Sequence, residues 1–141
     1  MKIKHIFKIF TIMMMLALTI FTTGCESQQE KQEKYTKACI ELEEYHKKVN
    51  KDYYKLVDKL IVTKDKEKRV ELLKQQVEIC KNYEKDINNT LEKMQKLATG
   101  NPELEKDIRE KRIEYHKAIQ SMNRLKGKLQ KGLKENYNVD A

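Results

Sequence analysis

The stretch YTKACIELEEYHKKVNKDYYKLVDKL, residues 35–60, decides the fold. Its apolar side chains recur at alternating intervals of four and three residues, and one member of the series is polar: Tyr35, Cys39, Leu42, His46, Val49, Tyr53, Leu56 and Leu60. Such intervals place side chains on one side of an α-helix and form the heptad repeat by which helices pack side by side. The stretch therefore predicts a long helix with an apolar stripe that faces partner helices.

The same repeat returns twice further along the chain. The second stripe consists of Val70, Leu73, Val77, Cys80, Glu84, Ile87, Leu91, Met94 and Ala98. The third consists of Leu104, Ile108, Tyr115, Ile119, Met122, Leu125, Leu129 and Leu133. Arg112 and Ile113 interrupt the first half of the third stripe, and Gly127 and Gly132 each cost about 1 kcal/mol relative to Ala in a helix interior. The sequence therefore predicts two more helices, the last with a weak end.

Short polar segments mark where these helices begin and end. SQQE (27–30) matches a capping box, and TKDKEK (63–68) offers Thr and Asp as caps, so we expect a turn near residues 63–66. Because this segment contains neither Gly nor Pro, one continuous helix is the alternative. In ATGNPELE (98–105), Gly100 suits the left-handed position after a helix, and Asn101 and Pro102 suit the start of the next. The expected helices are about 28–62, 66–98 and 102–135.

Composition favours the same fold class. The 141 residues suffice for one domain, 37% are charged, and there are only four Gly and one Pro. Three segments of similar length joined by short turns predict an all-α protein: an elongated up-down-up antiparallel three-helix bundle or coiled coil over residues 34–137, after an N-terminal signal segment. A coiled-coil hairpin with a loosely packed third helix is the alternative architecture.

The first 24 residues have a different character. A basic start, with Lys2, Lys4 and Lys8, is followed by a run without charged side chains from Ile9 to Cys25. Its apolar core, IFTIMMMLALTIF (9–21), is shorter than the roughly 20 residues that span a membrane. This pattern predicts a signal peptide over residues 1–24 that is removed. An uncleaved membrane anchor is the alternative.

The end of this segment, FTTGC (21–25), resembles the lipobox of bacterial lipoproteins. Gly24 and Cys25 match the small residue and the modified cysteine of that motif, whereas Thr22 stands where the family usually has Leu. The resemblance covers only this first part of the chain. It implies that Cys25 carries a covalent diacylglyceryl lipid, that residues 25–33 form a lipidated linker, and that the mature protein is exported and anchored to a bacterial membrane. A secreted protein with a chance cysteine is the alternative.

The two other cysteines are not expected to form a disulfide within one chain. With a turn near residue 64, Cys39 faces residue 89 or 90, which is roughly 15 Å along the helix from Cys80. A disulfide needs Cα atoms within about 7 Å. Both cysteines lie on apolar stripes, where Cys behaves as a small hydrophobic residue. The sequence leaves open whether a disulfide forms between two chains.

Candidate chemistry is sparse. The sequence EYHK occurs at 44–47 and 114–117, and an up-down-up bundle places both copies at similar heights. His46 and His116 are therefore weak candidates for binding a transition metal or small ligand. The positive charges of the neighbouring lysines disfavour a bound metal cation. Without a ligand, His46 would be a polar residue in the interior of the bundle, and His116 would be a residue at the boundary of the core. Neither a nucleophile motif nor a phosphate-binding Gly loop is present, so we predict a protein that is not an enzyme.

Charge distribution gives the clearest functional indication. From Cys25 onward the chain has 27 basic and 22 acidic residues, and from His116 onward six and two. The six are Lys117, Arg124, Lys126, Lys128, Lys131 and Lys134. In the bundle they meet four more basic residues, Lys64, Lys66, Lys68 and Arg69. These ten residues predict a basic tip, far from the lipid, that attracts anionic polymers such as teichoic acids, lipopolysaccharide or acidic glycans.

Two further interpretations of this basic region stay open. One is a solvated lysine-rich surface, and the other is an amphipathic helix that lies on an anionic bilayer. Nucleic acid is disfavoured because aromatic side chains do not alternate with the basic ones. The sequence thus predicts a membrane-anchored envelope lipoprotein that acts as a non-catalytic helical spacer or interaction module, in adhesion, wall contact or exclusion. A ligand-binding bundle is the alternative function, and homo-oligomers are compatible with either.

Overall fold

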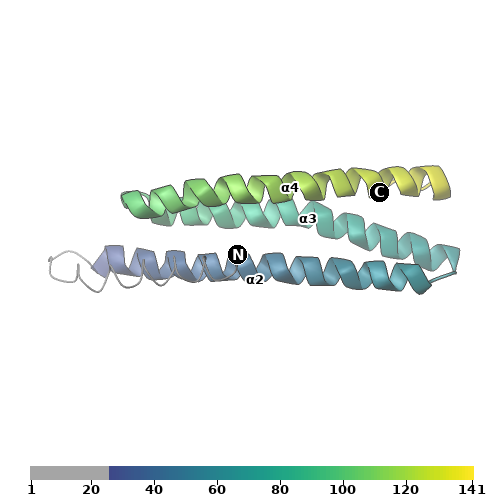
Figure 1. Cartoon of the computed structure of the whole chain (residues 1–141), viewed down its shortest axis with the longest axis horizontal. Helices are drawn as coiled ribbons and strands as arrows, with labels where there is room; N and C mark the ends of the chain where they lie inside the picture. Colours follow the sequence, from purple (N-terminus) through teal and green to yellow (C-terminus); the bar gives the residue numbers. More distant parts are fainter. Residues whose placement is uncertain (1–25) are drawn as a thin grey trace.

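The computed structural model describes residues 26–141, which form three α-helices: α2 (Glu26–Val62), α3 (Lys66–Ala98) and α4 (Pro102–Tyr137). The helices run up, down and up beside one another as an elongated bundle (Figure 1). This confirms the predicted fold class, and each boundary lies within two residues of the expected one. The predicted signal segment and Cys25 lie outside the described residues.

The helix α2 begins two residues before the expected residue 28, inside the segment that was also expected to be a linker. Residues 25–33 were expected to be a linker, but α2 is helical from Glu26, and the side chain of Gln32 is buried. Glu30 pairs with Lys34 one turn further along the helix. Glu, Gln and Lys all have high helix propensity, and pairs of opposite charge four residues apart add to it. Residues 26–33 are therefore helical, and Ser27 lies inside α2.

The turn between α2 and α3 lies where it was expected. The carboxylate of Asp65 accepts a hydrogen bond from the backbone N–H of Lys68 at 2.9 Å and so caps α3. Arg69 reaches back across the turn and donates to the carbonyls of Leu60 (2.8 Å) and Thr63 (2.9 Å). Such carbonyls at a helix end otherwise lack partners within the helix. The alternative of one continuous helix is therefore wrong.

The second turn also matches the sequence signals. Gly100 has φ 86°, the left-handed region that glycine adopts at little cost. The side chain of Asn101 accepts from the backbone N–H groups of Glu103 and Leu104, and Pro102 is the first residue of α4. The carboxylate of Glu105 accepts from the N–H of Gly100 at 3.0 Å. This short, well-capped connection sets α4 antiparallel to α3.

The core extends through all three helices. In α4 the buried residues are Leu104, Ile108, Tyr115, Ile119, Met122 and Leu133. The third helix is therefore firmly packed, and the loose hairpin alternative does not hold. In Figure 1, α3 lies beside α4 near the second turn and approaches α2 toward the first. None of the helices in residues 26–141 combines the length and the apolar character that a membrane span requires.

Candidate functional site

His46 lies in a polar layer inside the bundle. Its Nδ1 is 2.8 Å from the hydroxyl of Tyr83, and its Nε2 is 3.2 Å from the amide nitrogen of Asn50. Tyr115 of α4 meets the imidazole edge to face, with ring centroids 5.9 Å apart. His46 thus has partners on both ring nitrogens and aromatic rings on two sides. It holds the three helices in register at this level.

His116 does not lie in the polar layer around His46. Its side chain is exposed, and its Nε2 is 3.0 Å from the amide nitrogen of Gln120 on the same helix. The structure therefore does not bring His46 and His116 together, although they belong to the same repeated motif. Within residues 26–141, no group of three or more His, Cys, Asp and Glu side chains is arranged to hold a metal ion.

Several interior tyrosines likewise pack inside the bundle and form hydrogen bonds. Tyr35 donates to Asp107 at 2.6 Å and Tyr45 donates to Asp86 at 2.7 Å, so one bond joins α2 to α4 and the other joins α2 to α3. Burial, and then the neighbouring carboxylate, raise the pKa of both hydroxyls. Burial also raises the pKa of Tyr83 to about 12. These hydroxyls therefore stay protonated at neutral pH and fix the register of the helices.

Cys39 and Cys80 are free thiols, and both are buried. Burial raises the pKa of Cys39 to about 11, against the opposing effect of the nearby Lys111 charge. The Sγ of Cys80 lies 4.0 Å from the Sδ of Met122, in an apolar part of the α3–α4 interface. A thiol that stays protonated is a poor nucleophile and metal ligand. Both cysteines act as small core residues.

The structure separates the six basic residues that the sequence places on α4. Lys117, Arg124 and Lys128 are exposed and lie on one side of the helix, because they are spaced by seven and four residues. Lys126 is partly buried, since a step of two residues turns it away from that side. The structure thus brings three of the six together as an open basic row.

The other two lysines have acidic neighbours. Lys131 lies 3.7 Å from Glu135, and Lys134 lies 3.0 Å from Asp140 of the C-terminal tail. That tail follows a left-handed Asn138 and turns back toward α4. Part of the positive charge predicted for the tip is therefore neutralised by its own chain.

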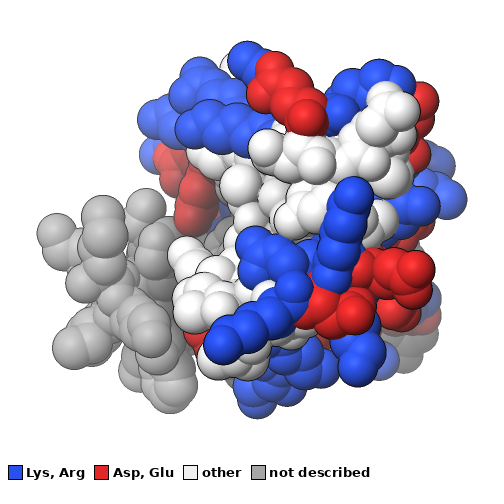
Figure 2. Space-filling view, turned by 90° about the vertical axis from the view of Figure 1, so that its right-hand side faces the viewer, with Lys and Arg blue, Asp and Glu red and all other residues white. Residues whose placement is uncertain are grey.

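The turn at residues 63–69 forms the rest of the predicted tip. Lys64, Lys66 and Lys68 are exposed. The guanidinium of Arg69, however, donates to the hydroxyl of Tyr137 at 3.2 Å in addition to the two carbonyls of the turn. Arg69 thus fastens α4 to the turn. Figure 2 shows this end of the bundle: basic side chains surround an uncharged centre, and acidic ones interrupt them.

A second basic row was not predicted. Lys74, Lys81 and Lys85 of α3 are exposed and follow the same spacing of seven and four residues as the row on α4. The signal was present in the sequence as a basic pattern at helical spacing, opposite the apolar stripe. It was missed because acidic residues such as Glu78 and Glu84 lie between these lysines along the chain.

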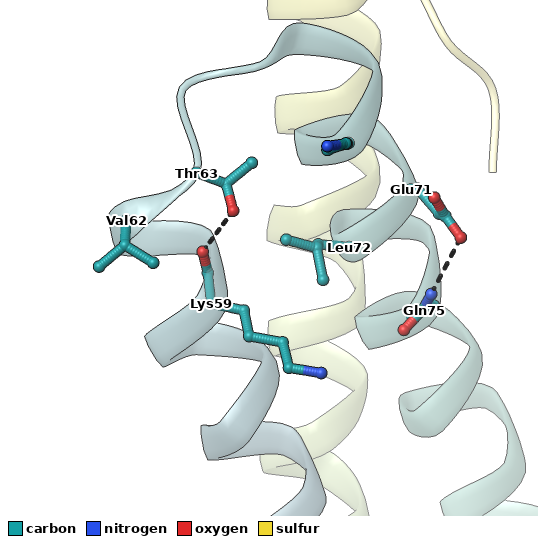
Figure 3. Close-up of a pocket in the computed structure, with 7 residues that line it drawn as sticks. Lys59, Val62, Thr63, Glu71, Leu72 and Gln75 are labelled. Carbon is teal, nitrogen blue, oxygen red and sulfur yellow. Dashed lines mark hydrogen bonds between the residues drawn. The ribbon is translucent and has the colours of Figure 1, made fainter.

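A shallow depression lies between the end of α2 and the start of α3. It measures about 350 Å³ and is lined by Lys59, Val62, Thr63, Lys68, Glu71, Leu72 and Gln75. In Figure 3, Lys59 and Leu72 lie along its walls, and Glu71 and Gln75 are joined by a hydrogen bond on α3. The lining mixes both charges with apolar groups, and its polar side chains do not converge on one point. This depression is not the candidate site.

The two basic rows on α3 and α4 are therefore the strongest candidates for interaction surfaces, each on its own helix. Comparison of the chain with protein-family models, curated proteins and solved structures finds no match.

Proposed function

We propose that this protein is a lipid-anchored component of a bacterial cell envelope, in which the helical bundle acts as a spacer or interaction module. The observation that carries the proposal is the sequence FTTGC at residues 21–25, immediately before the helix that begins at Glu26. A diacylglyceryl group on Cys25 would hold one end of the bundle on the bilayer. The 37 residues of α2 would then extend about 55 Å from it.

The charge of the bundle supports an anionic partner. The open row of Lys117, Arg124 and Lys128 is accompanied by the exposed lysines of the first turn. Exposed charges of one sign attract polyanions, and salt screens this attraction. Anionic polymers of the envelope, such as teichoic acids, lipopolysaccharide or acidic glycans, are the partners we propose. Adhesion, wall contact and exclusion are roles that such a contact would serve.

The interior supports a role without catalysis. The titratable groups inside the bundle include tyrosine hydroxyls and thiols with raised pKa values, such as Tyr83 at about 12 and Cys39 at about 11. Catalytic bases and nucleophiles instead have pKa values close to the working pH. These groups therefore serve packing and register.

Mass spectrometry of the N-terminal peptide, from the membrane fraction of the native host, tests the proposal. We expect a peptide that begins at Cys25 and carries the added diacylglyceryl mass. A Cys25→Ser variant should keep its first 24 residues and lose the lipid. A wild-type peptide that begins at Met1, or at an unmodified residue after another cut, would show that the anchoring proposal is wrong.

A further inference from the structure

We infer that the outer side of the second half of α2, residues 47–62, binds the surface of an anionic lipid bilayer. This region, which we name the α2 surface, combines three large apolar side chains with five exposed lysines: Lys47, Lys48, Lys51, Lys55 and Lys59. The inference goes beyond the proposed function and does not depend on it, because it concerns a noncovalent contact made by the described residues.

The apolar side chains of the α2 surface are open to solvent. Tyr54, Ile61 and Val62 are 65%, 74% and 77% exposed. Among residues 26–141, the other large apolar side chains that are exposed are Ile40 and Ile113. Single exposed apolar residues are common in soluble proteins, whereas a group of them marks a contact surface. The three that lie within residues 54–62 of one helix form such a group.

Helical spacing places the α2 surface on one side of the helix. Lys47, Tyr54 and Ile61 are seven residues apart, so they form one line along α2. A second line with the same spacing ends at Val62, about 100° further around the helix, and Lys51 lies between the two lines. The buried residues of α2 lie on the opposite side, toward α3 and α4. The lysines and the apolar residues therefore share one outward face, which is about 22 Å long.

Charge distinguishes the two halves of α2. Residues 47–62 contain five lysines and two aspartates, whereas residues 26–46 contain three lysines and six glutamates. Asp52 is partly buried, and Asp58 is exposed. None of the five lysines forms an ion pair within residues 26–141. The second half of α2 thus carries positive charge that is free to meet negatively charged lipid headgroups.

The mixture of lysine and apolar side chains suits a bilayer better than a soluble polyanion. The alkyl stem of lysine allows its ammonium group to stay at the level of the phosphates while apolar neighbours enter the acyl region. Tyr54 suits the boundary between headgroups and acyl chains, where tyrosine is enriched. Binding of a helix to such a surface combines apolar burial with attraction to anionic lipids. A soluble polymer of phosphate and polyol would use the lysines and leave Ile61 and Val62 in water.

The test measures co-sedimentation of residues 26–141, which contain the three packed helices and their core, with lipid vesicles. The vesicles contain phosphatidylcholine alone or with about 30% phosphatidylglycerol, the anionic lipid that the lysines should recognise. We expect binding to the anionic vesicles to be about 10-fold tighter or more at low salt. It should weaken at least several-fold when NaCl is raised from about 50 to about 300 mM, because salt screens exposed charges.

A charge variant tests the lysines of the α2 surface. Lys47→Gln, Lys51→Gln, Lys55→Gln should weaken binding to anionic vesicles about 10-fold or more, because each lysine near the bilayer contributes to the attraction. The matched control removes three charges from the exposed row on α4, through Lys117→Gln, Arg124→Gln and Lys128→Gln. It should change binding less than about threefold, since charges further than the Debye length from the bilayer are screened. An equal loss in both variants would mean attraction by net charge and would overturn the inference.

An apolar variant distinguishes a bilayer from other partners. Tyr54→Ser, Ile61→Ser, Val62→Ser should weaken binding to vesicles about 10-fold, because the apolar contact is lost. Its control, Ile113→Ser on α4, also alters an exposed apolar residue and should leave binding unchanged. Circular dichroism should show that every variant folds, since all the altered side chains are exposed.

Three further results would overturn the inference. The first is equal binding to neutral and anionic vesicles, or binding to neither. The second is tighter binding of soluble poly(glycerol phosphate) that the apolar variant retains, which would assign the lysines to a polymer. The third is a dimer of residues 26–141 in analytical ultracentrifugation that the apolar variant dissociates, which would assign the surface to a second copy of the chain.

The inference and the proposed function fail separately. If residues 26–141 bind anionic vesicles through the α2 surface but Cys25 is unmodified in the host, the surface contact stands and the lipid anchor does not. If Cys25 carries the lipid but residues 26–141 ignore anionic vesicles, the proposed function stands without the inference.

Discussion

The two ends of the bundle are stabilised in different ways. Near the second turn, Met94, Ala98 and Ile108 are 0% exposed, and the helices meet through close apolar packing. Near the first turn, Ile61 and Val62 are 74% and 77% exposed, and hydrogen bonds from Arg69 hold the helix ends together. Apolar burial is non-directional and scales with area, whereas a hydrogen bond depends on one geometry. The end near the second turn, the packed end, is therefore stabilised by buried apolar volume. The end near the first turn, the tied end, is stabilised by hydrogen bonds from single side chains.

The largest expected effect comes from the packed end. Ile108→Ala removes a fully buried side chain and should lower the free energy of unfolding by about 2–5 kcal/mol, through lost burial and the cavity left behind. Urea unfolding of residues 26–141 measures it. Ile61→Ala, at the exposed end of α2, is the control and should cost less than about 0.5 kcal/mol. Similar losses for both variants would contradict the distinction between the ends.

The second effect comes from the tied end. Arg69→Ala removes three hydrogen bonds and should lower the free energy of unfolding by about 1.5–3 kcal/mol, the range for bonds made by a charged group. Hydrogen exchange at the backbone amides of the first turn should also accelerate. Arg69→Lys should not restore stability, because an ammonium group cannot reproduce the planar guanidinium. Lys68→Ala, next to it and exposed, serves as the control. If hydrogen exchange is unchanged in Arg69→Ala, the hydrogen bonds of Arg69 do not stabilise the first turn.

The third effect lies between the ends and depends on pH. The pKa of Tyr83 is raised from about 10 to about 12, so the folded state holds the proton more tightly than the unfolded state. Stability from this group is complete below pH 10 and is lost as pH rises through 12, by up to about 1.4 kcal/mol per pH unit. Unfolding midpoints measured from pH 8 to 11.5 should fall more steeply in wild type than in Tyr83→Phe. If the midpoints of wild type and Tyr83→Phe fall in parallel with pH, groups other than Tyr83 cause the loss of stability at alkaline pH.

The smallest effects compare the caps of the two turns. Asn101→Ala and Asp65→Ala each remove a side chain that accepts from backbone N–H groups, and each should cost about 1 kcal/mol. Thermal melts of the two variants measure the difference. We expect the loss to be smaller for Asn101, because buried Ala98 and Leu104 hold the helices on both sides of that turn. A larger loss for Asn101 would mean that packing does not compensate for a missing cap.

The sequence predicted the helices well because their signals are local. Gly100, Asn101 and Pro102 define one turn through backbone preferences, and the apolar repeat defines the stripes. The repeat missed Tyr83, which is 0% exposed, and assigned its neighbour Glu84 to the stripe. A helix that packs against two partners buries a wider face than a stripe with intervals of three and four residues covers.

The candidate site was harder to predict because it depends on how helices lie beside each other. Six basic residues close in sequence suggested one patch, but helical geometry separates Lys126 from Arg124 and Lys128. The lysines of α3 form a separate row on their own helix. Arg69 was counted with the tip because hydrogen bonds across a turn leave no periodic signal. Lipidation of Cys25 stays a prediction.

The helical start of α2 gives the bundle the properties of a ruler. Because the backbone is helical from Glu26 to Val62, α2 runs as one rod to the first turn. Reach is then set by the number of residues, at about 1.5 Å each. Inserting one heptad into every helix would move the far turn outward by about 10 Å while keeping the same faces aligned.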